Sequence, residues 1–90
     1  MDALGYQQIT SLSAATALTV PAGTSLALVQ AESQNVRWRD DGTNPTASVG
    51  CILLSSQTLE YDAAQLAAVK FIEVASGAKL NIAYYGAKTS

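Results

Sequence analysis

The sequence predicts an all-β domain, either a small antiparallel β-sandwich or a jelly-roll-like barrel of about seven or eight short strands. Three observations indicate this class. The 90 residues suffice for one domain, spanning 1–90, with one modest core. Short apolar runs are separated by turn residues at the spacing of roughly 8–12 residues that sandwiches and barrels show. Apolar and polar residues alternate within several runs, which sets one face of a strand against a core.

The expected strands are bounded by turn-forming residues. They cover the following ranges: 6–10, 17–20, 25–32, 35–40, 49–54, 58–61, 68–75 and 79–85. The second strand stops at Pro21, which lacks an N–H, and Gly23 then permits a positive φ. Both faces of 25–32 are mostly apolar, so we expect this strand to be covered on both sides.

The clearest strand is 35–40. Its alternation directs Val36 and Trp38 to one face and Arg37 and Arg39 to the other. Because it shares a face with Val36, Trp38 is expected to anchor the core, although an exposed indole could instead stack on a sugar or a base. The turn that follows carries Gly in a left-handed position, in the sequence Asp40-Asp41-Gly42.

The segment 62–76 allows two interpretations. Asp62 with Gln65 resembles a capping box, and the alanines that follow favour a helix, which predicts at most one short helical turn near 62–66 before the strand over 68–75. The alternative is a single helix over 62–75. After this segment, Ser76-Gly77-Ala78 predicts a hairpin turn. In the last strand, alternation directs one ring of the Tyr84–Tyr85 pair into the core and the other to an edge or interface.

The composition excludes most site chemistry. Charged residues make up only 13% of the chain, against about 25% in an average soluble domain, and the net charge is −2. There is no histidine for general base catalysis or metal binding, and the single cysteine, Cys51, forms no internal disulfide and is expected to be buried. Five basic residues do not make a surface for nucleic acid. We therefore expect no enzyme activity, no cofactor and no metal site.

The candidate partner-binding residues are Arg37, Arg39, Asp40, Asp41 and Tyr85. The two arginines share a strand face, where they could bind carboxylates of another protein or pair with nearby acids of their own sheet. Asp40 and Asp41 are adjacent on a turn, so their side chains diverge and do not form a glycosidase pair. A surface poor in charge is easy to desolvate, which favours a role in assembly.

Several stretches resemble small virion proteins of tailed bacteriophages. They are 30–32, the run Val-Arg-Trp-Arg-Asp-Asp-Gly at 36–42, 45–47 with Gly50, 69–73 and 77–85. The resemblance implies a β-sandwich or jelly-roll-like fold and a place in the phage particle, with a head decoration or cement role. It implies no catalytic residues.

The expected function is therefore that of a virion structural protein that binds the assembled capsid, bridges neighbouring subunits and forms a dimer or trimer. One alternative is a tail- or fibre-associated module that contacts a host glycan through Trp38 or Tyr85, or another virion protein. A second is a cytoplasmic regulator of another protein. No secretory signal or membrane span is evident, so synthesis is expected in the host cytoplasm and residence in the virion, with neither nucleic acid nor membrane as partner.

Overall fold

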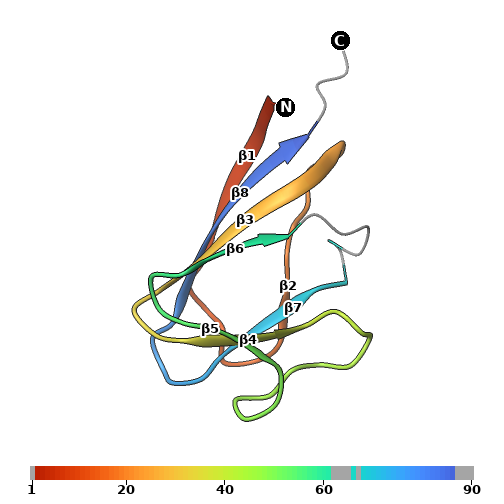
Figure 1. Cartoon of the computed structure of the whole chain (residues 1–90). Helices are drawn as coiled ribbons and strands as arrows, with labels where there is room; N and C mark the ends of the chain where they lie inside the picture. The colour runs from red at the N-terminus through yellow and green to blue at the C-terminus, as the bar shows by residue number, and fades with distance from the viewer. Residues whose placement is uncertain (1, 62–65, 67, 87–90) are drawn as a thin grey trace.

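The computed structural model of the protein describes residues 2–61, 66 and 68–86. Eight strands follow one another: β1 Asp2–Ile9, β2 Thr16–Ala17, β3 Thr24–Glu32, β4 Val36–Arg39, β5 Cys51–Leu53, β6 Thr58–Tyr61, β7 Lys70–Glu73 and β8 Lys79–Gly86. No helix occurs among the described residues (Figure 1). The all-β prediction and the expected number of strands are confirmed.

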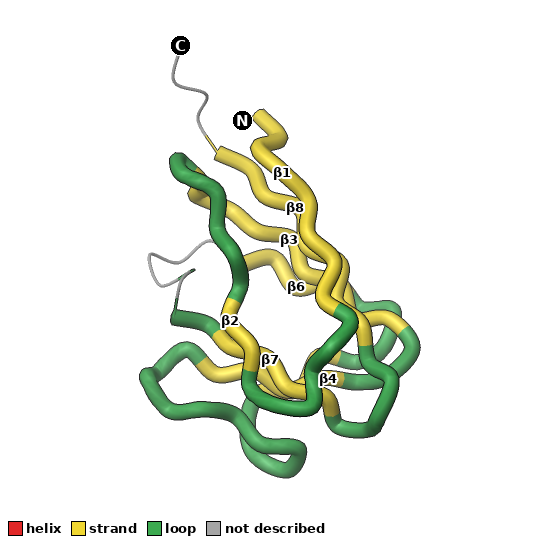
Figure 2. Tube along the Cα trace, turned by 180° about the vertical axis from the view of Figure 1, so that it is seen from behind, coloured by secondary structure: helices red, strands yellow, loops and turns green. Residues whose placement is uncertain are grey.

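The strands form two antiparallel four-stranded sheets, which we name the β8 sheet and the β4 sheet. Their strand orders are β1-β8-β3-β6 and β2-β7-β4-β5. The pairs β1–β8, β2–β7, β3–β6 and β4–β5 are nested, so the chain follows the path of one long hairpin folded over on itself. The two sheets lie on opposite sides of the domain (Figure 2). Nested pairing across two four-stranded sheets is the jelly-roll form of a β-sandwich.

The core lies between the two sheets and is built from alternate residues of each strand. The β8 sheet contributes Ala27, Val29, Ala31, Leu80, Ile82 and Tyr84, and the β4 sheet contributes Val36, Leu53 and Phe71. Burial of a Val, Leu, Ile or Phe side chain stabilises a fold by about 1.5–3 kcal/mol. These alternating positions therefore supply most of the energy that holds the two sheets together.

The outer face of the β8 sheet is less covered than the sequence predicted. On β3, Leu28 is half-buried and Gln30 is exposed, so the prediction that this strand is covered on both sides is wrong. A jelly roll has only two layers, and each sheet therefore meets the core on one face alone. The prediction that one of the paired tyrosines enters the core is confirmed by Tyr84. Tyr85 lies half-buried on the outer face of a central strand and not at an edge, and its place in an interface stays a prediction.

Two predictions about the second half of the chain need correction. Gly77 adopts the expected left-handed backbone (φ 95°), but it joins β7 to β8, which lie in different sheets. The prediction of a hairpin there is wrong, because the strands of a hairpin must pair with each other. A single helix over 62–75 is also wrong, since Lys70–Glu73 is a strand. The predicted helical turn near 62–66 falls mainly on 62–65, outside the described residues.

Strand boundaries also shift from those expected. The first strand starts at Asp2, the second pairs only over Thr16–Ala17, and the fifth is limited to Cys51–Leu53. Pairing, which determines where a strand ends, depends on distant partners that local composition does not reveal.

Candidate functional site: the β4–β5 hairpin

An apolar strip is exposed along the edge of the β4 sheet. Four large apolar side chains are exposed among the described residues, and three of them fall within six positions: Val49 (51% exposed), Ile52 (47%) and Leu54 (43%). We call these three residues the β5 strip. The fourth, Tyr6, lies on β1 in the other sheet. Exposed apolar side chains scattered singly are ordinary, whereas a contiguous group indicates a contact surface.

Arg37 shapes the loop that leads to this strip. Its Nε donates a hydrogen bond to the carbonyl oxygen of Ala47 (3.2 Å), and one terminal nitrogen donates to the carbonyl oxygen of Gly50 (2.8 Å). The guanidinium therefore holds the return of the loop against β4. The predicted pairing of Arg37 with an acid of its own sheet is not found among the described residues, because its partners there are main-chain carbonyls. Contact with carboxylates of another protein stays a prediction.

Arg39 has the local acidic partner that the sequence allowed. Its Nε and a terminal nitrogen both bond to the carboxylate of Asp41, at 3.1 and 2.5 Å. This forked hydrogen bond raises the pKa of Arg39 and lowers the pKa of Asp41 from the ordinary value of 3.8. The backbone N–H of Thr43 also donates to Asp41, and Gly42 takes the left-handed conformation expected of it (φ 87°).

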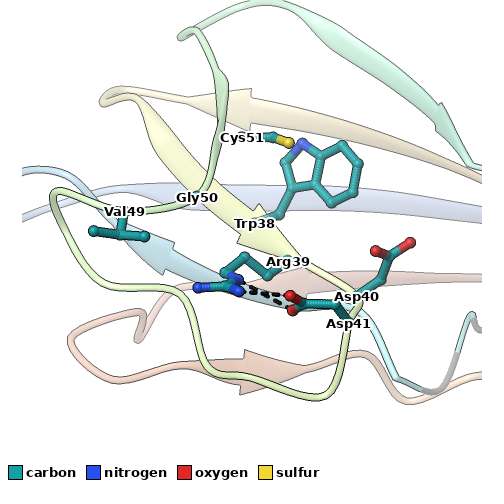
Figure 3. A pocket seen from close by; sticks show the side chains of 7 residues that line it. All are labelled: Trp38, Arg39, Asp40, Asp41, Val49, Gly50 and Cys51. Atoms are coloured by element: carbon teal, nitrogen blue, oxygen red, sulfur yellow. Dashed lines mark hydrogen bonds and ion pairs between the residues drawn. The ribbon is translucent and has the colours of Figure 1, made fainter.

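An open depression of about 450 Å³ lies between the ion pair and the strip. It is lined by Trp38, Arg39, Asp40, Asp41, Val49, Gly50 and Cys51. Figure 3 shows the Trp38 ring beside Cys51, while the paired side chains of Arg39 and Asp41 lie together on the other side of the strand. The lining of the depression thus includes an indole, a cation and two carboxylates, with the indole and the ion pair on opposite sides of β4.

Trp38 packs against the core as predicted. Its ring meets that of Tyr61 edge-to-face, with ring centroids 5.9 Å apart and planes at 87°. The Tyr61 hydroxyl donates a short hydrogen bond to the carboxylate of Asp40. Burial, and secondly this hydrogen bond, raises the pKa of Tyr61 to about 12. Asp40 is thereby drawn towards the β8 sheet, so the two adjacent aspartates diverge as expected.

The structure gathers four of the five predicted partner-binding residues on one hairpin: Arg37, Arg39, Asp40 and Asp41. Tyr85 lies apart from them, on the outer face of the β8 sheet. The β5 strip was missed, because 49–54 was interpreted only as a strand. The prediction that Cys51 is buried is wrong, since this thiol is exposed. An edge strand leaves such side chains uncovered, and the uncharged run from Gly42 to Leu59 was the available signal.

No group of three or more His, Cys, Asp or Glu side chains within 2–61, 66 and 68–86 is placed to hold a metal ion. In the same part of the chain, no helix is long and apolar enough to span a membrane. No protein family, curated protein or solved structure matches the chain.

Proposed function

We propose that the chain is a structural protein of a tailed-bacteriophage particle, a head decoration or cement protein that binds the assembled capsid and bridges neighbouring subunits. The observation that carries this proposal is the β5 strip, an apolar group on a chain that is poor in charge. Interface cores are depleted in charged residues, and burial of apolar area drives association. The resemblance to phage virion proteins supports the particle as the place where that burial occurs.

Bridging requires two separate contact surfaces, and the domain offers two. The β5 strip lies at the edge of the β4 sheet. The outer face of the β8 sheet carries Tyr6 (66% exposed) with the half-buried Leu26, Leu28 and Tyr85. The register places Tyr6 and Leu28 in one row across the sheet, on either side of Ala83, and Leu26 opposite Tyr85 in another row. Two apolar surfaces on different sheets suit a protein that joins two larger bodies.

Such a protein would stabilise the capsid by mass action. A ligand that binds the assembled shell and not the free subunits lowers the free energy of the shell by RT ln(1 + [L]/Kd), which is about 2.7 kcal/mol at a concentration of 100 Kd. No group has to react in this mechanism. The residues of the β4–β5 hairpin then serve to present the strip, and Arg39 with Asp41 lies at its polar margin.

The proposal is tested by the composition of the particle. Particles purified from the phage that encodes the chain are analysed by quantitative mass spectrometry. We expect the chain in a fixed ratio to the major capsid protein, and we expect that ratio to persist through a salt gradient that strips loosely bound host proteins. Complete absence of the chain from particles that contain all other structural proteins would contradict a virion role.

A second candidate is a module that contacts a host glycan. The depression favours it, because its lining includes an indole, carboxylates and a guanidinium, which are groups that bind sugars by stacking and hydrogen bonding. Trp38 is the only tryptophan, so its fluorescence reports any ligand bound there. A saturable change with mono- or oligosaccharides, abolished by Asp41→Asn, would support this function. An unchanged spectrum at millimolar sugar would remove it.

A further inference from the structure

We propose that the free edge of β5 pairs with β5 of a second copy, so that two chains form one continuous sheet across a two-fold axis. The inference rests on the proposed function and specifies how the bridge is made: the β5 strip contacts a second copy, and the resulting dimer presents the outer faces of its two β8 sheets to neighbouring capsid subunits. β5 is the last strand of its sheet, and among the residues that the structure describes it pairs with β4 alone (Figure 1). An edge strand presents unpaired main-chain groups to which another strand can add.

The hydrogen bonds of β4 fix the direction in which its main-chain groups point. The carbonyl oxygen of Asn35 accepts a hydrogen bond from the N–H of Val74, just beyond β7 (3.0 Å). Successive residues of a strand bond to opposite sides, so Val36 and Trp38 direct their main-chain groups towards β5. The partners of these two residues on β5 are Leu53 and Cys51. Those two pairs therefore carry the ladder between β4 and β5.

Ile52 lies between the two ladder residues of β5. Its N–H and carbonyl oxygen consequently point away from β4, towards the free edge. The turn after β5 continues the same alternation of main-chain direction. The N–H of Ser55 points towards β4 and donates to the Asn35 side chain (2.7 Å), whereas the N–H of Leu54 donates to the Gln57 side chain (3.1 Å). One residue thus offers both a donor and an acceptor, which is what a self-paired antiparallel strand needs at its two-fold axis.

Of the other three edges, β1 and β6 carry protection that β5 lacks, and β2 is one residue shorter than β5. β1 has a bulge between Ala3 and Gly5, and the Gln7 side chain on it holds the backbone N–H of Thr19 (3.1 Å). β6 carries the charge of Glu60, and β2 is only two residues long. Bulges, covering segments, charges and shortness all discourage edge pairing. The three residues of β5 carry no charge and no proline, and among the described residues no segment other than β4 forms a backbone hydrogen bond with Ile52.

A second copy suits this edge better than a different protein of opposite charge. No charged residue occurs between Gly42 and Leu59, so two copies can meet here without bringing like charges together. With the two-fold axis at Ile52, the Ile52 residues of the two copies lie opposite each other. Leu54 of one copy then lies opposite Gly50 of the other, beside the depression. Gln57 already occupies both the N–H and the carbonyl oxygen of Leu54, and Arg37 occupies the carbonyl oxygen of Gly50. The pairing is therefore limited to the hydrogen bonds of Ile52, and we expect a weak dimer.

The first test measures the mass of the isolated protein in solution, without any particle. Light scattering coupled to size exclusion, with loading from about 10 μM to 1 mM to span weak association, should show the mass rising from 9.3 kDa towards that of two chains. Ile52→Lys should weaken the dimer at least tenfold. Thr58→Lys is the matched control, an exposed position on the edge strand β6, and should leave the dimer unchanged. A wild type that stays monomeric at every concentration overturns the inference.

The second test fixes the register. In the proposed pair the two Ile52 Cα atoms lie about 5.5 Å apart, within the range that a disulfide spans, whereas the two Cys51 Cα atoms lie roughly 8 Å apart. Cys51→Ser combined with Ile52→Cys should therefore cross-link under mild oxidant, and wild type with Cys51 alone should not. Efficient cross-linking through Cys51, or none through position 52, contradicts the register. If the protein proves monomeric in solution but still binds the particle, the dimer is excluded and the proposed function stands.

Discussion

Arg37 is the residue on which the shape of the β4–β5 loop depends most. Its two hydrogen bonds to the carbonyl oxygens of Ala47 and Gly50 link the start of the hairpin to its return. An alanine at this position leaves those carbonyls without the cation that holds them. The position therefore belongs to the architecture of the loop, and only indirectly to the surface that a partner would contact.

We predict that Arg37→Ala lowers the free energy of unfolding by about 1.5–3 kcal/mol, the range for hydrogen bonds to charged groups. Arg37→Lys should recover little of this, because an ammonium does not reproduce the forked geometry of the guanidinium. Urea titration followed by tryptophan fluorescence measures the change. Arg39→Ala is the control and should leave the midpoint almost unchanged, since its partner Asp41 is exposed. Equal losses in the two alanine variants would contradict the anchoring role.

At the scale of single elements, the return of the β4–β5 loop depends on a glycine. Gly50 has φ 141°, and a Cβ there would lie 3.1 Å from the Trp38 carbonyl oxygen and 3.2 Å from the Arg37 Cβ. We expect Gly50→Ala to destabilise the fold by roughly 1–3 kcal/mol through backbone strain. Gly42→Ala is matched to it, because Gly42 also has a positive φ but faces open space. A thermal melt in which Gly42→Ala costs more than Gly50→Ala would refute this ordering.

The elements themselves were largely predictable from the sequence, and their assignment to sheets was not. Alternation in Leu80, Ile82 and Tyr84 identified β8 and its core face, because a strand that meets one core has a period of two. The turn at Gly77 was equally clear. Whether that turn closes a hairpin or crosses between sheets depends on which distant strand each side pairs with, and composition around the turn does not encode that choice.

One part of the candidate site was likewise predictable from the sequence, and another part was not. Local spacing brought Arg37, Arg39, Asp40 and Asp41 to one hairpin, since strand and turn residues adjacent in sequence remain adjacent in space. The β5 strip was not predicted, because Ile52 and Leu54 have the composition of core residues. They are exposed because they lie at the edge of a two-layer sandwich, where Ile52 faces outward next to the buried Leu53 and Leu54 follows the end of β5.

The whole molecule should lose stability in strong alkali through two tyrosines. Burial raises the pKa values of Tyr61 and Tyr84 to about 12, above the ordinary value of 10.0. The neutral phenol is therefore favoured in the folded state, and its contribution is complete below pH 10 and is lost as the pH rises towards 12. Denaturant titrations across this window should show a falling midpoint, with tyrosinate absorbance appearing on unfolding. Tyr84→Phe should flatten the fall, and an equally steep fall in that variant would contradict its cause.

At the scale of the whole molecule, the central claim is that the protein binds the assembled capsid and bridges its subunits. The melting temperature of reconstituted capsids tests this claim most directly. Particles from a phage that lacks the gene are incubated with purified protein and melted in a calorimeter. Wild type should raise the melting temperature of the shell in a saturable way, Ile52→Lys should raise it less at the same concentration, and Thr58→Lys should match wild type. An unchanged melting temperature at saturating wild-type protein, with no protein sedimenting with the shells, would contradict the claim.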